Sequence, residues 1–128
     1  SKYSLTTSGN LAKAYAGICY YNLGEYEEAI RSLSAYDGDD NYFAPSVTGL
    51  IGDCYVELDE PSKAIRYFSK AAASGNEIVA PIFLKKAAIT LESTGDTKKA
   101  LKNYLEIKEK YPLSQEAQDI DKYITRLQ

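Results

Sequence analysis

The sequence predicts an all-α protein, a right-handed α-solenoid in which three helical hairpins are followed by a C-terminal capping helix. Apolar residues recur at three- and four-residue steps, which is typical of helices, and no segment sustains the apolar–polar alternation of a strand. One pattern of small residues also occurs three times, at spacings of about 35 residues, which predicts a repeat architecture. Its equivalent positions are Gly17, Gly52 and Ala88 in one series, and Ala29, Ala64 and Ala100 in another.

The chain is expected to form one domain, because its 128 residues can bury a core but are too few to divide further. We expect the repeats at about 10–42, 43–76 and 77–112, and the capping helix at 114–127. Residues 1–9 are expected to be the tail of a preceding repeat that these 128 residues do not include.

The first hairpin begins with a helix whose apolar residues have helical spacing. Gly24 is expected to end this helix as a C-terminal cap. Glu25, Glu27 and Glu28 then place negative charge in the first turn of the next helix, where the helix dipole favours it. The apolar stripe of the first helix consists of Leu11, Ala12, Tyr15, Ala16, Cys19, Tyr20 and Leu23.

The second and third hairpins follow the same plan. In the second hairpin, a helix over 44–58 precedes Pro61, a residue suited to the first turn of a helix. In the third, a helix over 77–93 is expected to stop at Gly95. Pro81 falls early in that helix and is expected to shift its start.

A capping helix is predicted after Pro112, with Ser114 as its N-terminal cap. Its apolar residues have helical spacing and are expected to cover the open apolar face of the last hairpin. They are Ala117, Ile120, Tyr123, Ile124 and Leu127.

The repeated small residues indicate close helix crossings. Glycine in the middle of a helix costs about 0.5–1 kcal/mol relative to alanine, so Gly17 and Gly52 at the same repeat phase need a compensating contact. Facing small residues supply it by letting the two helices of a hairpin approach each other closely.

This pattern resembles the tetratricopeptide repeat, a helix–turn–helix unit of about 34 residues. The likeness covers about residues 10–112. Asp59 departs from the Gly of the family pattern, and Pro61 and Thr97 depart from its Tyr. The matching residues are Gly17, Tyr20, Gly24, Tyr26, Ala29 and Leu33, then Gly52, Tyr55, Ala64, Phe68 and Ala71, then Ala88, Leu91, Gly95, Ala100, Tyr104 and Pro112.

A narrower likeness concerns the segment Lys110–Ala117, which is similar to the repeat exits of bacterial membrane-anchored tetratricopeptide proteins of the YfgM type. The segment Lys2–Leu5 echoes it. This resemblance implies a bacterial periplasmic protein anchored to the inner membrane, with the cytoplasm as the alternative. The anchor would be a segment absent from this chain.

The family resemblance also implies a concave groove lined by the first helix of each hairpin. We therefore expect a protein or peptide partner to bind there, with Tyr21 as an anchor that has a polar tip. The groove positions carried over from the family are Leu11, Ala14, Ile18, Tyr21 and Asn22, then Ser46, Gly49, Asp53, Val56 and Glu57, then Ile82, Lys85, Ile89, Glu92 and Ser93.

Other interpretations of the inner face stay open. It could bind a small ligand or glycan among tyrosines, or it could simply be the inner side of a stack. A self-assembling array is a further alternative, because residues 1–64 carry four Lys or Arg against ten Asp or Glu, whereas residues 65–128 carry eleven against eight. We do not expect the groove to bind the acidic C-terminal tail of a chaperone. Family members that bind such tails hold the carboxylates with Lys and Asn, and Ala14 and Ile18 stand at those positions here.

Composition argues against several functional classes. A net charge of −3 argues against a nucleic-acid partner. The absence of His argues against most acid–base, nucleophilic and zinc chemistry, so we expect neither an enzyme nor a cofactor. Asp37, Asp39 and Asn41 begin like a calcium loop, but Tyr42 replaces the required Gly and Thr48 the bidentate Glu, so no metal is expected.

Cys19 and Cys54 occupy the same position in successive repeats. Stacked repeats separate equivalent atoms by about 10 Å, the diameter of a helix, whereas the Cα atoms of a disulfide lie within about 7 Å. We therefore expect two free thiols, both buried.

Overall fold

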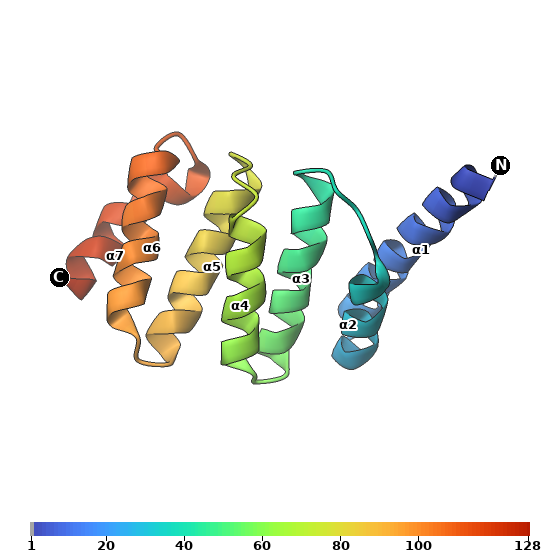
Figure 1. Ribbon diagram of the computed structural model, residues 1–128. Helices are drawn as coiled ribbons and strands as arrows, with labels where there is room; N and C mark the ends of the chain where they lie inside the picture. The colour runs from blue at the N-terminus through green and yellow to red at the C-terminus, as the bar shows by residue number, and fades with distance from the viewer. Residues whose placement is uncertain (1) are drawn as a thin grey trace.

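The computed structural model describes residues 2–128, with side chains from Ser8 onward (Figure 1). The described residues form helices and no strand. The helices are α1 (Lys2–Asn22), α2 (Tyr26–Ala35), α3 (Phe43–Glu57), α4 (Pro61–Ala72), α5 (Val79–Ser93), α6 (Thr97–Lys110), the 3-10 helix η1 (Gln115–Asp119) and α7 (Ile120–Leu127).

The helices form three antiparallel hairpins that stand in a row, so the predicted all-α solenoid is confirmed. Figure 1 shows α1 and α2 at one end of the row and α7 at the other. The longest helix, α1, extends beyond α2 at the N-terminal end. No helix among residues 2–128 is long and apolar enough to span a membrane.

The three hairpin turns have the same geometry. A residue with positive φ stands two positions after the end of each first helix: Gly24 at 77°, Asp59 at 58° and Gly95 at 88°. The next N–H then donates to a carbonyl five residues earlier, as Glu25 does to Tyr20 at 2.9 Å. This is the Schellman cap, and the same bonds join Glu60 to Tyr55 and Asp96 to Leu91. The departure of Asp59 from the family pattern therefore leaves the turn intact.

The predicted close crossings are present. A Cβ added to Gly17 would lie 2.5 Å from Cγ of Leu33, and one added to Gly52 would lie 2.6 Å from Cδ1 of Phe68. The facing residues Ala29 and Ala64 are completely buried. Gly17 and Gly52 are therefore required because there is no room for a Cβ atom, and not because the backbone conformation excludes other residues.

The core is divided along the row rather than gathered at one centre. One buried cluster joins α1, α2 and α3, and includes Ala14, Leu33 and Ile51. The other joins α4 to α7, and includes Phe68 and Tyr104. Tyr55 packs against both clusters and links them.

Two predicted helix starts are shifted, and side-chain caps explain both. The helix expected at 77–93 begins at Val79, because the Asn76 side chain accepts the N–H groups of Ile78 and Val79 at 2.8 and 2.9 Å. Near the start of α3, Asp40 accepts the N–H groups of Tyr42 and Ala44, among others. These bonds lower the pKa of Asp40 and give the acidic loop a capping role.

The C-terminal segment differs from the prediction of one helix over 114–127. Ser114 does cap it, accepting the N–H of Ala117 at 3.2 Å. The helix then breaks at Asp119, whose φ and ψ of −118° and 17° are not helical and whose carboxylate pairs with Lys85. Beyond the break, Ile120 and Ile124 are buried against α6 as expected of a cap.

The first helix begins earlier than the expected repeat boundary. The helix α1 runs without a break from Lys2 through residue 10. The assignment of residues 1–9 to a preceding repeat stays a prediction, and the side chains of residues 1–7 lie outside the described part.

Both thiols are free, as predicted, but only one is buried. Cys54 is completely buried between α3 and the preceding hairpin, and this burial raises its pKa to about 11. Cys19 is exposed. The prediction that both are buried is wrong because no hairpin among the described residues covers that face of α1.

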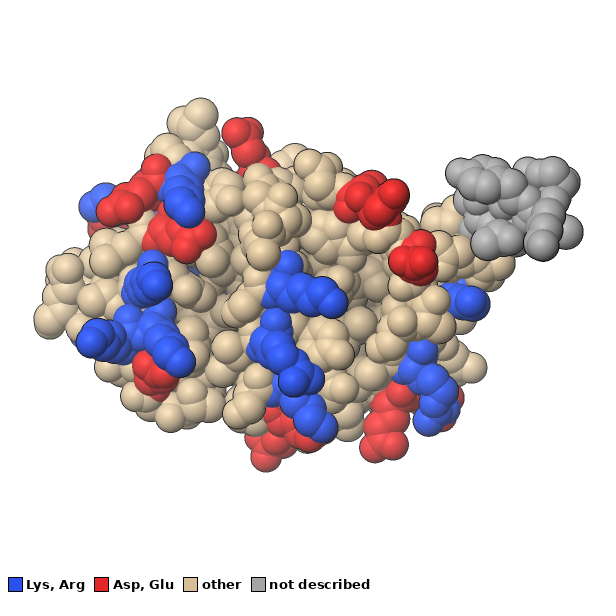
Figure 2. Space-filling view, in the orientation of Figure 1, with Lys and Arg blue, Asp and Glu red and all other residues tan. Residues whose placement is uncertain are grey.

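Charged side chains gather on the second helices. Figure 2 shows Lys and Arg side chains in rows over α4 and α6. On α4 they are Lys63, Arg66 and Lys70, all exposed. This face of the stack is solvated and charged, so an apolar binding surface has to be sought elsewhere.

Candidate partner-binding groove

The first helices of the hairpins surround a small cavity. It has a volume of about 210 Å³ and lies among α1, α3 and α5. Three of its lining residues, Ile18, Ser46 and Asp53, are positions that the family resemblance assigned to the groove. The others are Phe43, Val47, Leu50 and Phe83. The walls are mostly apolar, which suits an apolar side chain of a partner.

An ion pair crosses the groove between α3 and α5. The ammonium of Lys86 donates to both carboxylate oxygens of Asp53, at 2.8 and 3.0 Å, and lies 5.6 Å from the centre of the Phe83 ring. Burial raises the pKa of Asp53, and the hydrogen bond and charge of Lys86 oppose that shift. The pair therefore holds a largely desolvated carboxylate in the groove.

Two apolar side chains are exposed beside this pair. Val56 is 46% exposed and Ile89 is 48% exposed. Val56 follows Asp53 by three residues, and Ile89 follows Lys86 by three residues. Each therefore lies about one helical turn beyond a member of the ion pair, on the same side of its helix. Both were predicted groove residues, and together they offer unpaired apolar surface.

Tyr21 stands at the α1 side of the groove. It is half-buried, and its ring packs edge-on against Tyr26 with centroids 5.6 Å apart. Burial raises its pKa, and the charges of Asp53 and Glu57 add to the shift. The phenol therefore stays protonated and can donate a hydrogen bond at the edge of an acidic surface.

Two predicted groove residues cannot touch a partner. Ala14 is completely buried. Gly49 is buried beneath the Phe83 ring, and a Cβ on it would lie 2.1 Å from Cζ of that ring. Both are inaccessible because they lie where α1 and α3 meet neighbouring helices.

Two more predicted residues are engaged by the C-terminal segment. Lys85 pairs with Asp119 at 3.3 Å. Glu92 accepts two bonds from Arg126, at 2.6 and 2.8 Å, and one from the Tyr104 hydroxyl. Their assignment as partner-binding residues is corrected accordingly, because η1 and α7 already satisfy both charges. The remaining predicted positions are half-buried or exposed: Leu11, Ile18, Asn22, Glu57, Ile82 and Ser93.

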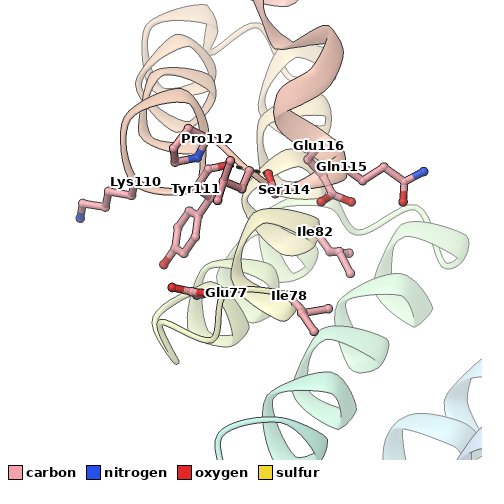
Figure 3. Close-up of a pocket in the computed structure, with 10 residues that line it drawn as sticks. Glu77, Ile78, Ile82, Lys110, Tyr111, Pro112, Ser114, Gln115 and Glu116 are labelled. Atoms are coloured by element: carbon pink, nitrogen blue, oxygen red, sulfur yellow. Dashed lines mark hydrogen bonds between the residues drawn. The ribbon is translucent and has the colours of Figure 1, made fainter.

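Sequence reasoning missed a second cavity. It has a volume of about 400 Å³ and lies between the α4–α5 loop and the segment that follows α6 (Figure 3). Ile78, 63% exposed, and Leu113, 98% exposed, line it together with Tyr111 and Glu77. Figure 3 shows the side chains of Ile78 and Ile82 pointing to the same side. The only signal for this cavity in the sequence is the presence of apolar residues next to loop residues, Ile78 after Gly75 and Asn76, and Leu113 after Pro112.

Comparison with known families gives one match. The model of the tetratricopeptide repeat matches residues 12–36 and 84–114, which contain most of the first and third hairpins. No curated protein sequence gives a significant match.

Several solved structures are similar over most of the chain. The N-terminal domain of stress-induced protein-1 from C. elegans has a TM-score of 0.79 at 14% identity, covering 94% of this chain and 95% of that one. The first tetratricopeptide repeat domain of Spaghetti (RPAP3), bound to the HSP90 peptide SRMEEVD, has a TM-score of 0.70 at 19% identity. The match covers 92% of this chain and 89% of that one. The Yersinia enterocolitica type III secretion chaperone SycD, in complex with a peptide of the translocator YopD, has a TM-score of 0.74 at 18% identity. The match covers 91% of this chain and 89% of that one.

Identities this low establish similarity of fold alone. The hairpins, the Schellman turns and the small residues at each crossing agree with that fold. The chain therefore has the fold of a tetratricopeptide repeat solenoid, and its first and last hairpins match that repeat in sequence.

Proposed function

We propose that this chain is a protein-interaction scaffold that holds a segment of a partner protein in the groove formed by α1, α3 and α5. The observation that carries the proposal is the paired exposure of Val56 and Ile89 beside the 210 Å³ cavity. Covering such apolar surface is favourable by about 25 cal/mol per Å². The exposed polar residues Asn22, Glu57 and Ser93 form a rim that can orient the segment.

The groove favours a particular kind of segment. The exposed Glu57 leaves the α3 side acidic beside the Asp53–Lys86 pair, so an acidic tail would be repelled, whereas a Lys or Arg beside an apolar residue would be attracted. The HSP90 peptide bound by Spaghetti ends in an acidic sequence. We propose a different ligand here, an apolar anchor with a neighbouring basic residue.

A peptide selection on residues 1–128 tests this proposal. Selected peptides should be apolar and basic, and Val56→Glu or Ile89→Glu should weaken their binding by at least about tenfold, or 1.4 kcal/mol. Ser62→Glu, which adds the same charge on α4, is the matched control and should leave binding unchanged. Peptides that respond to Ser62→Glu but not to the groove variants would place binding elsewhere.

On the sequence resemblance we also propose that the full-length protein works in a bacterial envelope complex, facing the periplasm. The repeat-exit likeness of Lys110–Ala117 supports this placement. A full-length Cys19→Ser protein with Ser62→Cys on an exposed site should react with a membrane-impermeant maleimide once the outer membrane is opened. Labelling only after complete lysis would instead indicate the cytoplasm.

A further inference from the structure

The outward face of α1 is apolar and uncovered among the described residues. We call this the α1 face, and it consists of the predicted stripe Ala12, Tyr15, Ala16, Cys19 and Leu23. Tyr15 is 57% exposed and Leu23 is 72% exposed, while Ala12 and Cys19 are also exposed. Lys13 is the single charged residue from Ser8 to Asn22. A solvated helix face ordinarily carries more charge than this.

The equivalent face of α3 is covered. Thirty-five residues after Ala12, Ala16 and Cys19 stand Val47, Ile51 and Cys54, which are 5%, 5% and 0% exposed. They belong to the same buried cluster as Ala29 and Leu33 of α2. Leu58, the equivalent of Leu23, lies beside the turn that starts α2. The preceding hairpin therefore covers this face.

The equivalent face of α5 is covered in the same way. Phe83 and Ala87, which correspond to Ala12 and Ala16, are 7% and 0% exposed. The Phe83 ring stacks on Phe68 of α4 with centroids 6.0 Å apart. In both cases the second helix of the preceding hairpin supplies the cover, so the open α1 face continues an interface that the molecule builds twice.

We propose that the α1 face is a docking surface for an amphipathic helix that packs on α1 as α2 packs on α3. Polypeptide outside these 128 residues supplies that helix. Ala12 and Ala16 are smaller than their equivalents on α3, Val47 and Ile51. The incoming helix therefore packs closer to α1 than α2 does to α3, or it carries bulkier side chains that fill the space. None of the predicted groove residues belongs to this face, but Tyr15 at its edge packs against Phe43, which lines the groove cavity, with ring centroids 6.2 Å apart.

A second copy in head-to-tail contact is a less suitable occupant. The opposite end of the stack is formed by α7, whose Asp121, Lys122, Thr125 and Arg126 are exposed. Head-to-tail contact would bury Asp121, Lys122 and Arg126, together with their ion pairs, against the apolar α1 face, and removing charged groups from water is costly. The apolar face and the polar end therefore differ too much to form an array.

An in-phase duplication tests the docking surface directly. A chain composed of residues 10–44 followed by residues 10–128 places an added copy of α2 one repeat ahead of the original α1. The added copy carries Cys19→Ser, so the maleimide reaction of the original Cys19 reports whether its face is covered. We expect that reaction to slow at least about tenfold relative to residues 1–128, since exposed thiols react far faster than buried ones.

Two controls make the result decisive. Ala16→Glu in the receiving helix should restore fast labelling of Cys19, whereas Val56→Glu in the groove should leave its protection unchanged. A duplicated protein with full helical circular dichroism and an unprotected Cys19 would overturn the proposal. Sedimentation of residues 1–128 should show a monomer with reactive Cys19, and a dimer that protects Cys19 would assign the face to a second copy instead.

Discussion

At the scale of single residues, the helix crossings depend on positions with no room for a larger side chain. At Gly17, an added methyl group would meet the Leu33 side chain at 2.5 Å and its backbone nitrogen at 3.1 Å. At Gly9, on the same helix, nothing lies within 4 Å of an added Cβ. The two glycines of α1 therefore form a matched pair.

We expect Gly17→Ala and Gly9→Ala to have opposite effects on the free energy of unfolding. Gly17→Ala should lower it by about 1–3 kcal/mol through overpacking. Gly9→Ala should raise it by up to about 1 kcal/mol, because alanine favours the helix. Urea denaturation of both variants measures this, and equal effects would show that Gly17 is not at a tight crossing.

The Asp53–Lys86 pair gives a pH-dependent prediction. Burial raises the pKa of Asp53 in the folded protein, so the folded state prefers the protonated carboxyl. The stability gained from that proton is present at low pH and lost as pH rises through the folded pKa. Asp53→Asn should therefore be at least as stable as the parent at pH 7.

Urea denaturation at pH 7 and at about pH 3–4, near the ordinary range for Asp, tests this. The advantage of Asp53→Asn should shrink or reverse in acid. Lys86 is 43% exposed and can turn to water when its partner is neutral, so it does not confuse the comparison. A variant much less stable at pH 7 would mean that the ion pair outweighs desolvation.

At the scale of elements, the repeated turns explain why the hairpins have one shape. Asp59 adopts the left-handed conformation that Gly24 and Gly95 adopt in the other two turns. Non-glycine residues are strained there, although Asp tolerates it better than most. The second turn therefore carries a small strain that the others do not.

We expect Asp59→Gly to raise the free energy of unfolding by about 0.5–1 kcal/mol by removing this strain. Gly24→Ala should lower it by about 1 kcal/mol, since alanine is disfavoured at positive φ. Thermal denaturation of the two variants provides the test. A destabilised Asp59→Gly would indicate that the Asp59 side chain makes a compensating contact.

The C-terminal helix is expected to protect the last hairpin. Removing residues 113–128 uncovers Tyr104 and Ile107, both completely buried, and deprives Glu92 of Arg126. The truncated protein should bind a hydrophobic dye and aggregate on mild heating, because an uncapped solenoid exposes apolar surface. A truncated protein that stays soluble and equally stable would contradict the capping role.

At the scale of the whole molecule, the sequence predicted the hairpins well because their determinants are local. Small residues at one phase, a stripe of apolar residues and a turn residue fix each unit within about 35 positions. A shifted start of α5 was expected from Pro81, but where the helix begins depends on Asn76, whose side chain caps Ile78 and Val79, and the position of Asn76 in the sequence does not reveal that contact.

The site was harder to predict because its availability depends on contacts between units. Lys85 and Glu92 meet Asp119 and Arg126, each 34 residues later, and no local pattern shows which charge will be satisfied. Cys19 and Cys54 share one repeat position, yet differ in exposure because only Cys54 has a preceding hairpin to cover it. The position of a residue within its repeat predicts which way its side chain points, and the presence of a neighbouring hairpin decides whether that side chain is buried.

The central claim is that the groove face binds a partner while the face formed by α4 and α6 stays solvated. Photo-crosslinking in the full-length protein, within its native cell, tests it most directly. A photoreactive residue at Ser93 in the groove should capture a defined protein, and that capture should be lost with Val56→Glu. The same residue at Arg66 on α4 should capture none. Crosslinks of equal yield from both positions, or a groove product that survives Val56→Glu, would contradict the account.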